Sequence, residues 1–160
     1  MRQRAGGILI ENGKILLIHR IKIIDGIKKE YYVIPGGGIE ENEILVEATK
    51  RELLEEVGIE VNVISEKPIY TFEENNDKQS YLLIEKKSGN IGTGNGPEFT
   101  NEEYSDRGLY LIEMIELSDI LEGKINLLPE VLRESLILDI IKISDIKEIS
   151  SKDLIHIKNN

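Results

Sequence analysis

The chain has 160 residues, of which 40% are hydrophobic and 31% are charged, a composition typical of a globular protein. Its formal net charge of −10 opposes phosphates, so binding to nucleic acid or to an anionic membrane is disfavoured. The absence of cysteine excludes disulfides and thiolate chemistry. No apolar run is long enough for a secretory signal or a membrane span, so we expect a cytoplasmic protein.

The first part of the chain predicts three strands, at residues 7–10, 14–20 and 31–34. Asn12-Gly13 joins the first two as a hairpin, because both residues tolerate positive φ. Residues 23–29 are polar and contain a glycine, which predicts a connection. Pro35 and the glycines after it end the third strand.

A helix is predicted from Glu43 to Val57, with Asn42 as its N-cap and Gly58 as its stop. Further strands are predicted at 61–64, 69–72, 81–85 and 109–115, with a long glycine-containing loop over residues 88–108. A second helix begins at Pro129 and runs to about Ile143, with an apolar stripe at helical spacing.

This order of elements indicates an α/β (α+β) fold with a mixed sheet and helices against it. We expect one domain over residues 1–143, with 144–160 as a short helix or a mobile tail of the same domain. A homodimer through the apolar stripe of the second helix is one expectation; packing of that stripe on the chain's own sheet explains it equally well.

The first predicted helix carries three glutamates on one side. At 100° per residue, Glu56 lies about 40° from Glu52 and Glu55 about 60° from it on the other side, so the three share an arc of roughly 100°. Such like charges repel, and a divalent cation would relieve the repulsion. Glutamate-rich helix surfaces are also common, and the spacing alone leaves both interpretations open.

A longer pattern surrounds these glutamates. From Gly37 the chain reads glycine, five residues, Glu43, seven residues, and then Arg-Glu-Leu-Leu-Glu-Glu-Val-Gly-Ile over residues 51–59. This resembles the Nudix box, G-x5-E-x7-R-E-U-x-E-E-x-G-U with U aliphatic, at every defined position. The resemblance implies a Nudix-like α/β/α sandwich with a mixed β-sheet between helices.

The resemblance also implies roles for individual residues. Glu52, Glu55 and Glu56 are expected to bind Mg²⁺ (or Mn²⁺), with the Gly36 carbonyl as a further ligand. Arg51 is expected to support catalysis by holding the glutamates in orientation. The role of Glu43 stays open between ligation, pairing with Arg51 and capping the helix, with a structural role favoured. Gly37 and Gly38 are expected to let the backbone approach metal and substrate phosphate.

The implied reaction is attack of water on a pyrophosphate, with metal-bound oxygens and a carboxylate base. Glu55, Glu56 and Glu98 are the candidate catalytic carboxylates, with the neighbouring pair Glu102 and Glu103 as an alternative to Glu98. The loop that carries these last three could equally be a solvated connection.

Two further side chains are candidates for binding substrate. Tyr32, or its neighbour Tyr31, could stack on a nucleobase, although a tyrosine of the core is an equal alternative. Arg20 could contact phosphate or be an exposed cation at a strand end. His19 and His156 are isolated in the sequence and suggest neither a metal site nor a nucleophile.

The predicted function is therefore Mg-dependent hydrolysis of a nucleoside diphosphate linked to another moiety, which includes a nucleoside triphosphate, ADP-ribose and a nucleotide sugar. A non-catalytic Nudix-fold binding module is the alternative; such modules lack box glutamates, and all are present here. An isomerase on the same fold is disfavoured because the chain has no cysteine.

Overall fold

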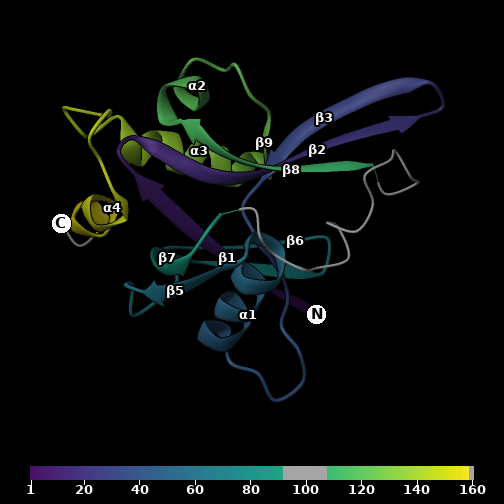
Figure 1. Ribbon diagram of the computed structural model, residues 1–160, viewed down its shortest axis with the longest axis horizontal. Coiled ribbons are helices and arrows are strands. Elements are labelled where there is room, and N and C mark those ends of the chain that lie inside the picture. The colour runs from purple at the N-terminus through teal and green to yellow at the C-terminus, as the bar shows by residue number, and fades with distance from the viewer. Residues whose placement is uncertain (92–107, 159–160) are drawn as a thin grey trace.

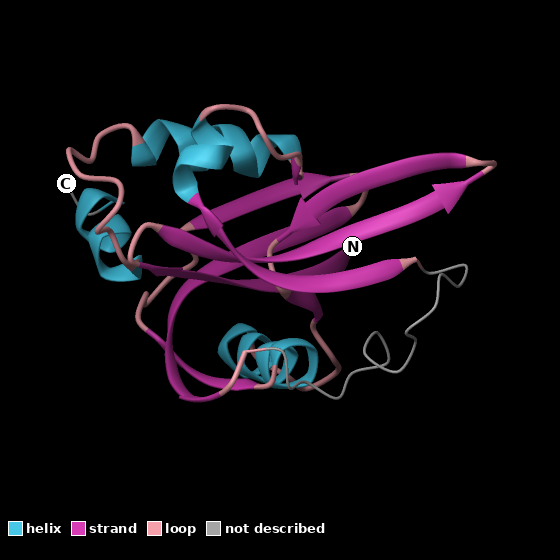
Figure 2. Cartoon of the chain, turned by 45° about the horizontal axis from the view of Figure 1, so that its top comes forward, coloured by secondary structure: helices cyan, strands magenta, loops and turns pink. Residues whose placement is uncertain are grey.

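The computed structural model describes residues 1–91 and 108–158, which form a mixed sheet with helices on both faces (Figures 1 and 2). Within these residues the strand order is β5-β7-β1-β2-β3-β9, while β4 pairs with β1, β6 with β7 and β8 with β2. The strands are β1 (Arg2–Glu11), β2 (Lys14–Ile24), β3 (Ile27–Val33), β4 (Gly36–Gly38), β5 (Ile59–Val63), β6 (Tyr70–Glu74), β7 (Asp77–Gly89), β8 (Leu109–Glu116) and β9 (Leu127–Leu128).

Two hairpins build the first part of the sheet. The predicted turn at Asn12 (φ 50°) and Gly13 (φ 74°) joins β1 to β2. The predicted connection over residues 23–29 is wrong, because β2 and β3 continue through it to a second turn at Asp25 (φ 52°) and Gly26 (φ 77°). This part of the hairpin extends away from the rest of the molecule (Figure 1), with exposed side chains on both faces.

Helix α1 (Leu45–Val57) covers one face of the sheet. It begins two residues later than predicted, with Ile44 as its N-cap, because Asn42 adopts φ 65° in the preceding turn. The Glu47 side chain accepts a hydrogen bond from the Ile44 N–H at 3.0 Å, which supplies the capping interaction that the sequence had suggested for Asn42. Gly58 ends the helix with φ 86°, as predicted.

The close approach of α1 to the sheet depends on Gly7 of β1. A methyl group at Gly7 would lie 2.8 Å from Cδ1 of Ile84 and 2.9 Å from Cδ2 of Leu53, so the missing side chain is what allows the helix to pack there. Leu53 and Val57 are fully buried at this contact, together with Ile59 of β5. The buried side of α1 therefore fixes how its glutamates are turned.

The opposite face is covered by α2 (Leu117–Leu121), α3 (Glu130–Ile140) and α4 (Ser151–Lys158) (Figure 2). Helix α2 was not predicted from the sequence. Helix α3 has Pro129 as its N-cap and ends at Ile140, three residues before the predicted end at Ile143. Helix α4 is the short-helix alternative for the C-terminal segment, and Ser151 anchors it by accepting the Ile10 N–H at 2.8 Å. None of the helices in the described residues is long and apolar enough to cross a membrane.

Candidate active site

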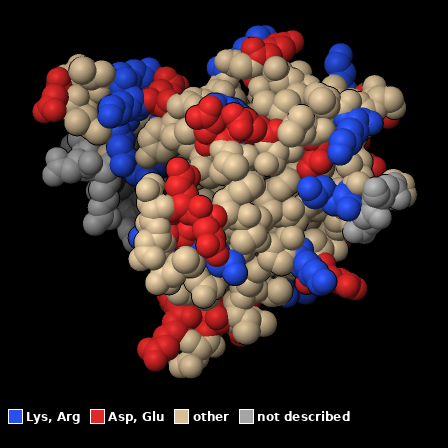
Figure 3. Space-filling view, turned by 180° about the vertical axis from the view of Figure 1, so that it is seen from behind, with Lys and Arg blue, Asp and Glu red and all other residues tan. Residues whose placement is uncertain are grey.

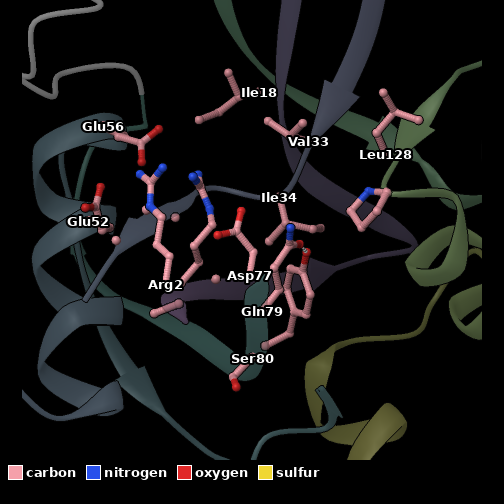
Figure 4. Close-up of a pocket in the computed structure, with 18 of the residues that line it drawn as sticks. Arg2, Ile18, Val33, Ile34, Glu52, Glu56, Asp77, Gln79, Ser80 and Leu128 are labelled. Atoms are coloured by element: carbon pink, nitrogen blue, oxygen red, sulfur yellow. Dashed lines mark hydrogen bonds between the residues drawn. The ribbon is translucent and has the colours of Figure 1, made fainter. Parts of the chain in front are cut away.

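An open cavity of about 700 Å³ lies between α1, the first half of β1 and the region where β3 meets β9. Glu52 and Glu56 of α1 line it, one helical turn apart, and Figure 4 shows both carboxylates on the same side of the cavity. The three glycines of β4, residues 36–38, line it beside them. The carboxylates and the glycine backbone of the box therefore face one space.

Arg51 holds the box together from outside the cavity. Its Nε and Nη2 donate to the two carboxylate oxygens of Glu43 at 2.7 and 2.9 Å, and Nη2 also donates to the Gly38 carbonyl at 3.0 Å. Its Nη1 donates to Oε1 of Glu52 at 2.9 Å and reaches Oε2 of Glu55 at 3.4 Å. Arg51 thus connects the glycine strand to Glu52 and Glu55, which is the contact that the expected orienting role requires.

The charges of this network stabilise one another. The Arg51 guanidinium lowers the pKa of the Glu43 carboxyl to about 2, mainly through its hydrogen bonds. In return Glu43, more than Glu52, raises the pKa of Arg51 above its ordinary value. Both carboxylate oxygens of Glu43 accept hydrogen bonds from Arg51. This pairing favours a structural role for Glu43 over metal ligation.

Gly37 is required by its distance to Glu52. A Cβ atom at Gly37 would collide with Oε1 of Glu52 and lie 2.6 Å from its Cδ, so only glycine leaves this carboxylate in place. At Gly38 the same atom would meet nothing nearer than Nη2 of Arg2 at 3.8 Å. The close contact with the Glu52 carboxylate is therefore specific to Gly37, since a Cβ atom at Gly36 would meet the backbone of Ala5 and Gly6 instead.

The donor set suits a hard divalent cation, since carboxylate and carbonyl oxygens are the ligands that Mg²⁺ prefers. Glu52 and Glu56 reach the cavity together, whereas Glu55 is turned toward Arg51 with 47% of its side chain exposed. Across the described residues no three acidic or histidine side chains are already grouped as an ion-binding cluster. The metal role of the three glutamates and of the Gly36 carbonyl therefore stays a proposal.

Three arginines line the same cavity as the two glutamates, and sequence reasoning had singled out only one of them. Arg20, a candidate for binding phosphate, lines the cavity together with Arg2 and Arg4 of β1. The parallel pairing of β1 with β7 explains their position, because Arg2 lies beside Asp77 and Arg4 beside Gln79, with the alternate residues of both strands on the cavity side. The available signal was that Arg2 and Arg4 are two positions apart, so that both side chains lie on one face if the segment is a strand.

The aromatic residues of the cavity differ from those that the sequence suggested. Of the described tyrosines, Tyr81 and Tyr110 line the cavity. The Arg20 guanidinium carbon lies 4.2 Å from the centre of the Tyr110 ring and 5.7 Å from that of Tyr31. Tyr32 instead packs against the core on the other face of the sheet, which favours the alternative of a core tyrosine.

His19 is the partner of Tyr32 on that face. The two rings are stacked with their centroids 4.2 Å apart, and His19 is buried between Glu30, at 2.5 Å from Nε2, and Glu113, at 3.1 Å from Nδ1. His19 was expected to be isolated, but the structure gives it two carboxylate partners. They lie on β3 and β8, so this cluster ties three strands together.

Glu98, Glu102 and Glu103 lie outside the described residues, so the loop candidates for the general base stay predictions. The described surface shows how the negative charge is distributed elsewhere. Figure 3 shows acidic side chains gathered in groups on the face behind that of Figure 1, with basic groups standing separately among them. On that face the charged side chains therefore form separate acidic and basic groups rather than one uniformly acidic surface.

Comparison with known families assigns the chain to a class. The model of the NUDIX domain matches residues 1–119, so the chain belongs to this family and is a Nudix-type hydrolase by family, as the box predicted. The matched segment contains the whole box, both hairpins and the cavity glutamates. Comparison with curated proteins gave no match.

Solved structures with a similar fold include several Nudix proteins. A NUDIX hydrolase from Nitrosomonas europaea has a TM-score of 0.60 and 19% identity over 85% of this chain and 68% of its own. The E. coli ORF135 protein has a TM-score of 0.57 and 21% identity over 91% and 95%. An ADP-ribose pyrophosphatase from Streptococcus suis has a TM-score of 0.55 and 14% identity over 90% and 94%. At these identities the likeness confirms the α/β/α sandwich and its mixed sheet.

Proposed function

We propose that the protein is a Mg²⁺-dependent pyrophosphohydrolase that acts on a nucleoside diphosphate linked to another moiety. The observation that carries the proposal is the juxtaposition of Glu52 and Glu56 with Arg2, Arg4 and Arg20 in one cavity. Carboxylates suit a hard cation, and arginines suit the phosphate oxygens of a diphosphate. A cavity of about 700 Å³ is within the usual range for ligands of this size.

In this proposal Glu52, Glu55 and Glu56, with the Gly36 carbonyl, hold Mg²⁺ or Mn²⁺. Bound there, the cation neutralises phosphate oxygens and lowers the pKa of the attacking water. Arg51 positions Glu52 and Glu55 through the hydrogen bonds described above. Gly37 leaves room for the Glu52 carboxylate next to the backbone.

The remaining steps are assigned to side chains of the chain itself. Arg2, Arg4 and Arg20 bind and orient the diphosphate, with Gly37 and Gly38 beside it. A carboxylate, Glu55, Glu56 or Glu98, takes the proton of the attacking water as its oxygen bonds to phosphorus. The bond from that phosphorus to the bridging oxygen breaks, and the second phosphate-containing fragment leaves.

The test is turnover of a nucleotide panel by the purified protein with Mg²⁺. The panel contains nucleoside triphosphates, ADP-ribose and nucleotide sugars, and the release of phosphate, pyrophosphate or monophosphate is followed. We expect Glu56→Gln to lower kcat at least 100-fold, on the order of the loss of a principal catalytic carboxylate. Glu60→Gln, the same change of charge at an exposed position of β5, should retain wild-type turnover.

Turnover of no compound in the panel would overturn the proposal and favour a non-catalytic nucleotide-binding module. Turnover with Glu56→Gln equal to wild type would overturn the role assigned to this carboxylate. Hydrolysis in water labelled with ¹⁸O identifies the phosphorus that is attacked, because only the fragment formed by attack carries the label.

A further inference from the structure

The two ends of the cavity differ in their chemistry. Glu52 and Glu56 stand at one end, whereas Val33, Ile34 and Leu128 form an apolar surface at the other (Figure 4). A diphosphate placed beside the glutamates would therefore direct the organic part of the substrate toward apolar side chains. A flat ring is the kind of group that such a surface accommodates without leaving polar atoms unpaired.

Gln79 lies between these two ends, and its amide is held in one orientation by Tyr81. The Tyr81 hydroxyl donates a hydrogen bond to Oε1 of Gln79 at 2.6 Å. Burial raises the pKa of Tyr81 to about 12, so its hydroxyl keeps its proton at neutral pH and remains a donor. The Tyr81 ring is itself fixed, because it lies where a side chain at Gly6 would otherwise be.

This arrangement determines which hydrogen-bonding atom of the Gln79 amide is available to a ligand. Its carbonyl oxygen already accepts a hydrogen bond, and among the described residues Tyr81 is the only side chain hydrogen-bonded to it. The amide nitrogen with its two N–H donors is the part left for the cavity. Gln79 is only partly buried and lines the cavity directly, so a ligand can reach that nitrogen.

We propose that Gln79 selects the base of the substrate by donating a hydrogen bond from its amide nitrogen to a ring carbonyl. The preferred substrates are then nucleotides with a 6-oxopurine or a 4-oxopyrimidine. The corresponding amino bases would place N–H donors against the N–H donors of Gln79. This inference rests on the proposed function only in taking the ligand to be a nucleotide.

The test is a comparison of binding within pairs of nucleoside monophosphates that differ at one position of the base. Calorimetry without metal compares inosine with adenosine 5′-monophosphate, and uridine with cytidine 5′-monophosphate. We expect the oxo member of each pair to bind about tenfold more tightly, on the order expected for one well-placed hydrogen bond. Equal affinities within both pairs would overturn the proposal.

Variants separate this role from a general effect on the cavity. Gln79→Leu should bring both affinity ratios close to one, and Gln79→Glu, which offers acceptors only, should favour the amino members. Gln3→Leu changes a glutamine that is exposed on β1, and should retain the wild-type ratios. Unchanged ratios in Gln79→Leu would overturn the assignment.

Tyr81→Phe tests the orienting hydrogen bond with little change in shape. It should reduce the preference without abolishing binding, and circular dichroism checks that it folds. Turnover of the matching triphosphates is measured separately with Mg²⁺. A protein that binds with the expected preference but does not turn over any nucleotide contradicts the proposed function alone. A protein that hydrolyses oxo and amino nucleotides with equal kcat/KM contradicts the role of Gln79 alone.

Discussion

The guanidinium group of Arg51 donates two hydrogen bonds to the Glu43 carboxylate, from Nε to Oε2 at 2.7 Å and from Nη2 to Oε1 at 2.9 Å. The two residues are eight positions apart in the sequence, and the turn before α1 brings their side chains together. The remaining N–H groups of Arg51 donate to Glu52, Glu55 and the Gly38 carbonyl, so a single side chain connects the turn, the glycine strand and two of the three helix glutamates.

Replacing Arg51 by lysine tests this geometry. Arg51→Lys keeps the charge but cannot reproduce the two-point contact, so we expect activity to fall about 10- to 100-fold, as for other partners that orient ligands. Steady-state kinetics at several Mg²⁺ concentrations measure the effect, which should include a higher Mg²⁺ requirement. Arg133→Lys on α3 is the matched control and should stay near wild type. Equal losses in both variants would contradict the orienting role.

Adding one methyl group at Gly37 should displace the Glu52 carboxylate, because Cβ would occupy the space of Oε1. We expect Gly37→Ala to lower kcat/KM at least tenfold, on the order of the cost of misplacing a catalytic group. Gly38→Ala, whose Cβ meets only Arg2 at 3.8 Å, should lose clearly less. If Gly38→Ala lowered kcat/KM more than Gly37→Ala in the same assay, the contact with Glu52 would not be what activity depends on.

Acid should weaken the contact between Glu43 and Arg51. The folded-state pKa of Glu43 is about 2, below the ordinary value of 4.5, so its contribution to stability is present above pH 4.5 and is lost as the pH falls toward 2. Urea unfolding at several pH values measures this. Wild type and Glu43→Gln should differ most at neutral pH and converge below pH 4.5. A difference that is constant with pH would exclude the linkage.

The anchor of α4 can be tested at Ser151, which is 2% exposed and accepts the Ile10 N–H in the middle of the structure. Ser151→Ala leaves this buried backbone donor without its partner, and we expect a loss of about 1–3 kcal/mol in the free energy of unfolding. Ser144→Ala, at an exposed position before α4, should change the stability by less than about 0.5 kcal/mol. Similar values for the two variants would show that the C-terminal helix is not held by this contact.

The parts of the structure that were predicted correctly are those with strong local signals. Asn12-Gly13 correctly predicted the first turn, and Gly58 correctly predicted the end of α1. The spacing of residues from Gly37 to Ile59 correctly predicted the family. The second hairpin was missed although Asp25-Gly26 is also a turn signal. Its residues are exposed on both sides, so the alternation that marks a half-buried strand is absent there.

The rest of the cavity could not be predicted because it depends on pairing between distant segments. Arg4 and Gln79 become neighbours only through the parallel register of β1 and β7, which brings together residues 75 positions apart. Tyr110 reaches the cavity because β8 pairs with β2 beside Arg20. Helix α1 begins two residues later than predicted because Asn42 adopts φ 65° in the preceding turn, a conformation that helix propensity does not describe.

Strand β1 supports α1 at Gly7 and carries Arg2 and Arg4, so both charged sides of the cavity are attached to the same ten residues. The separation between the glutamates and two of the three arginines is therefore set by the packing of α1 on β1. Sequence changes in cavity-lining residues outside β1 and α1, such as Tyr110 of β8 and Leu128 of β9, can alter which molecules fit without changing that separation. The chain can thus diversify its substrates at the periphery while the spacing needed for chemistry stays constant.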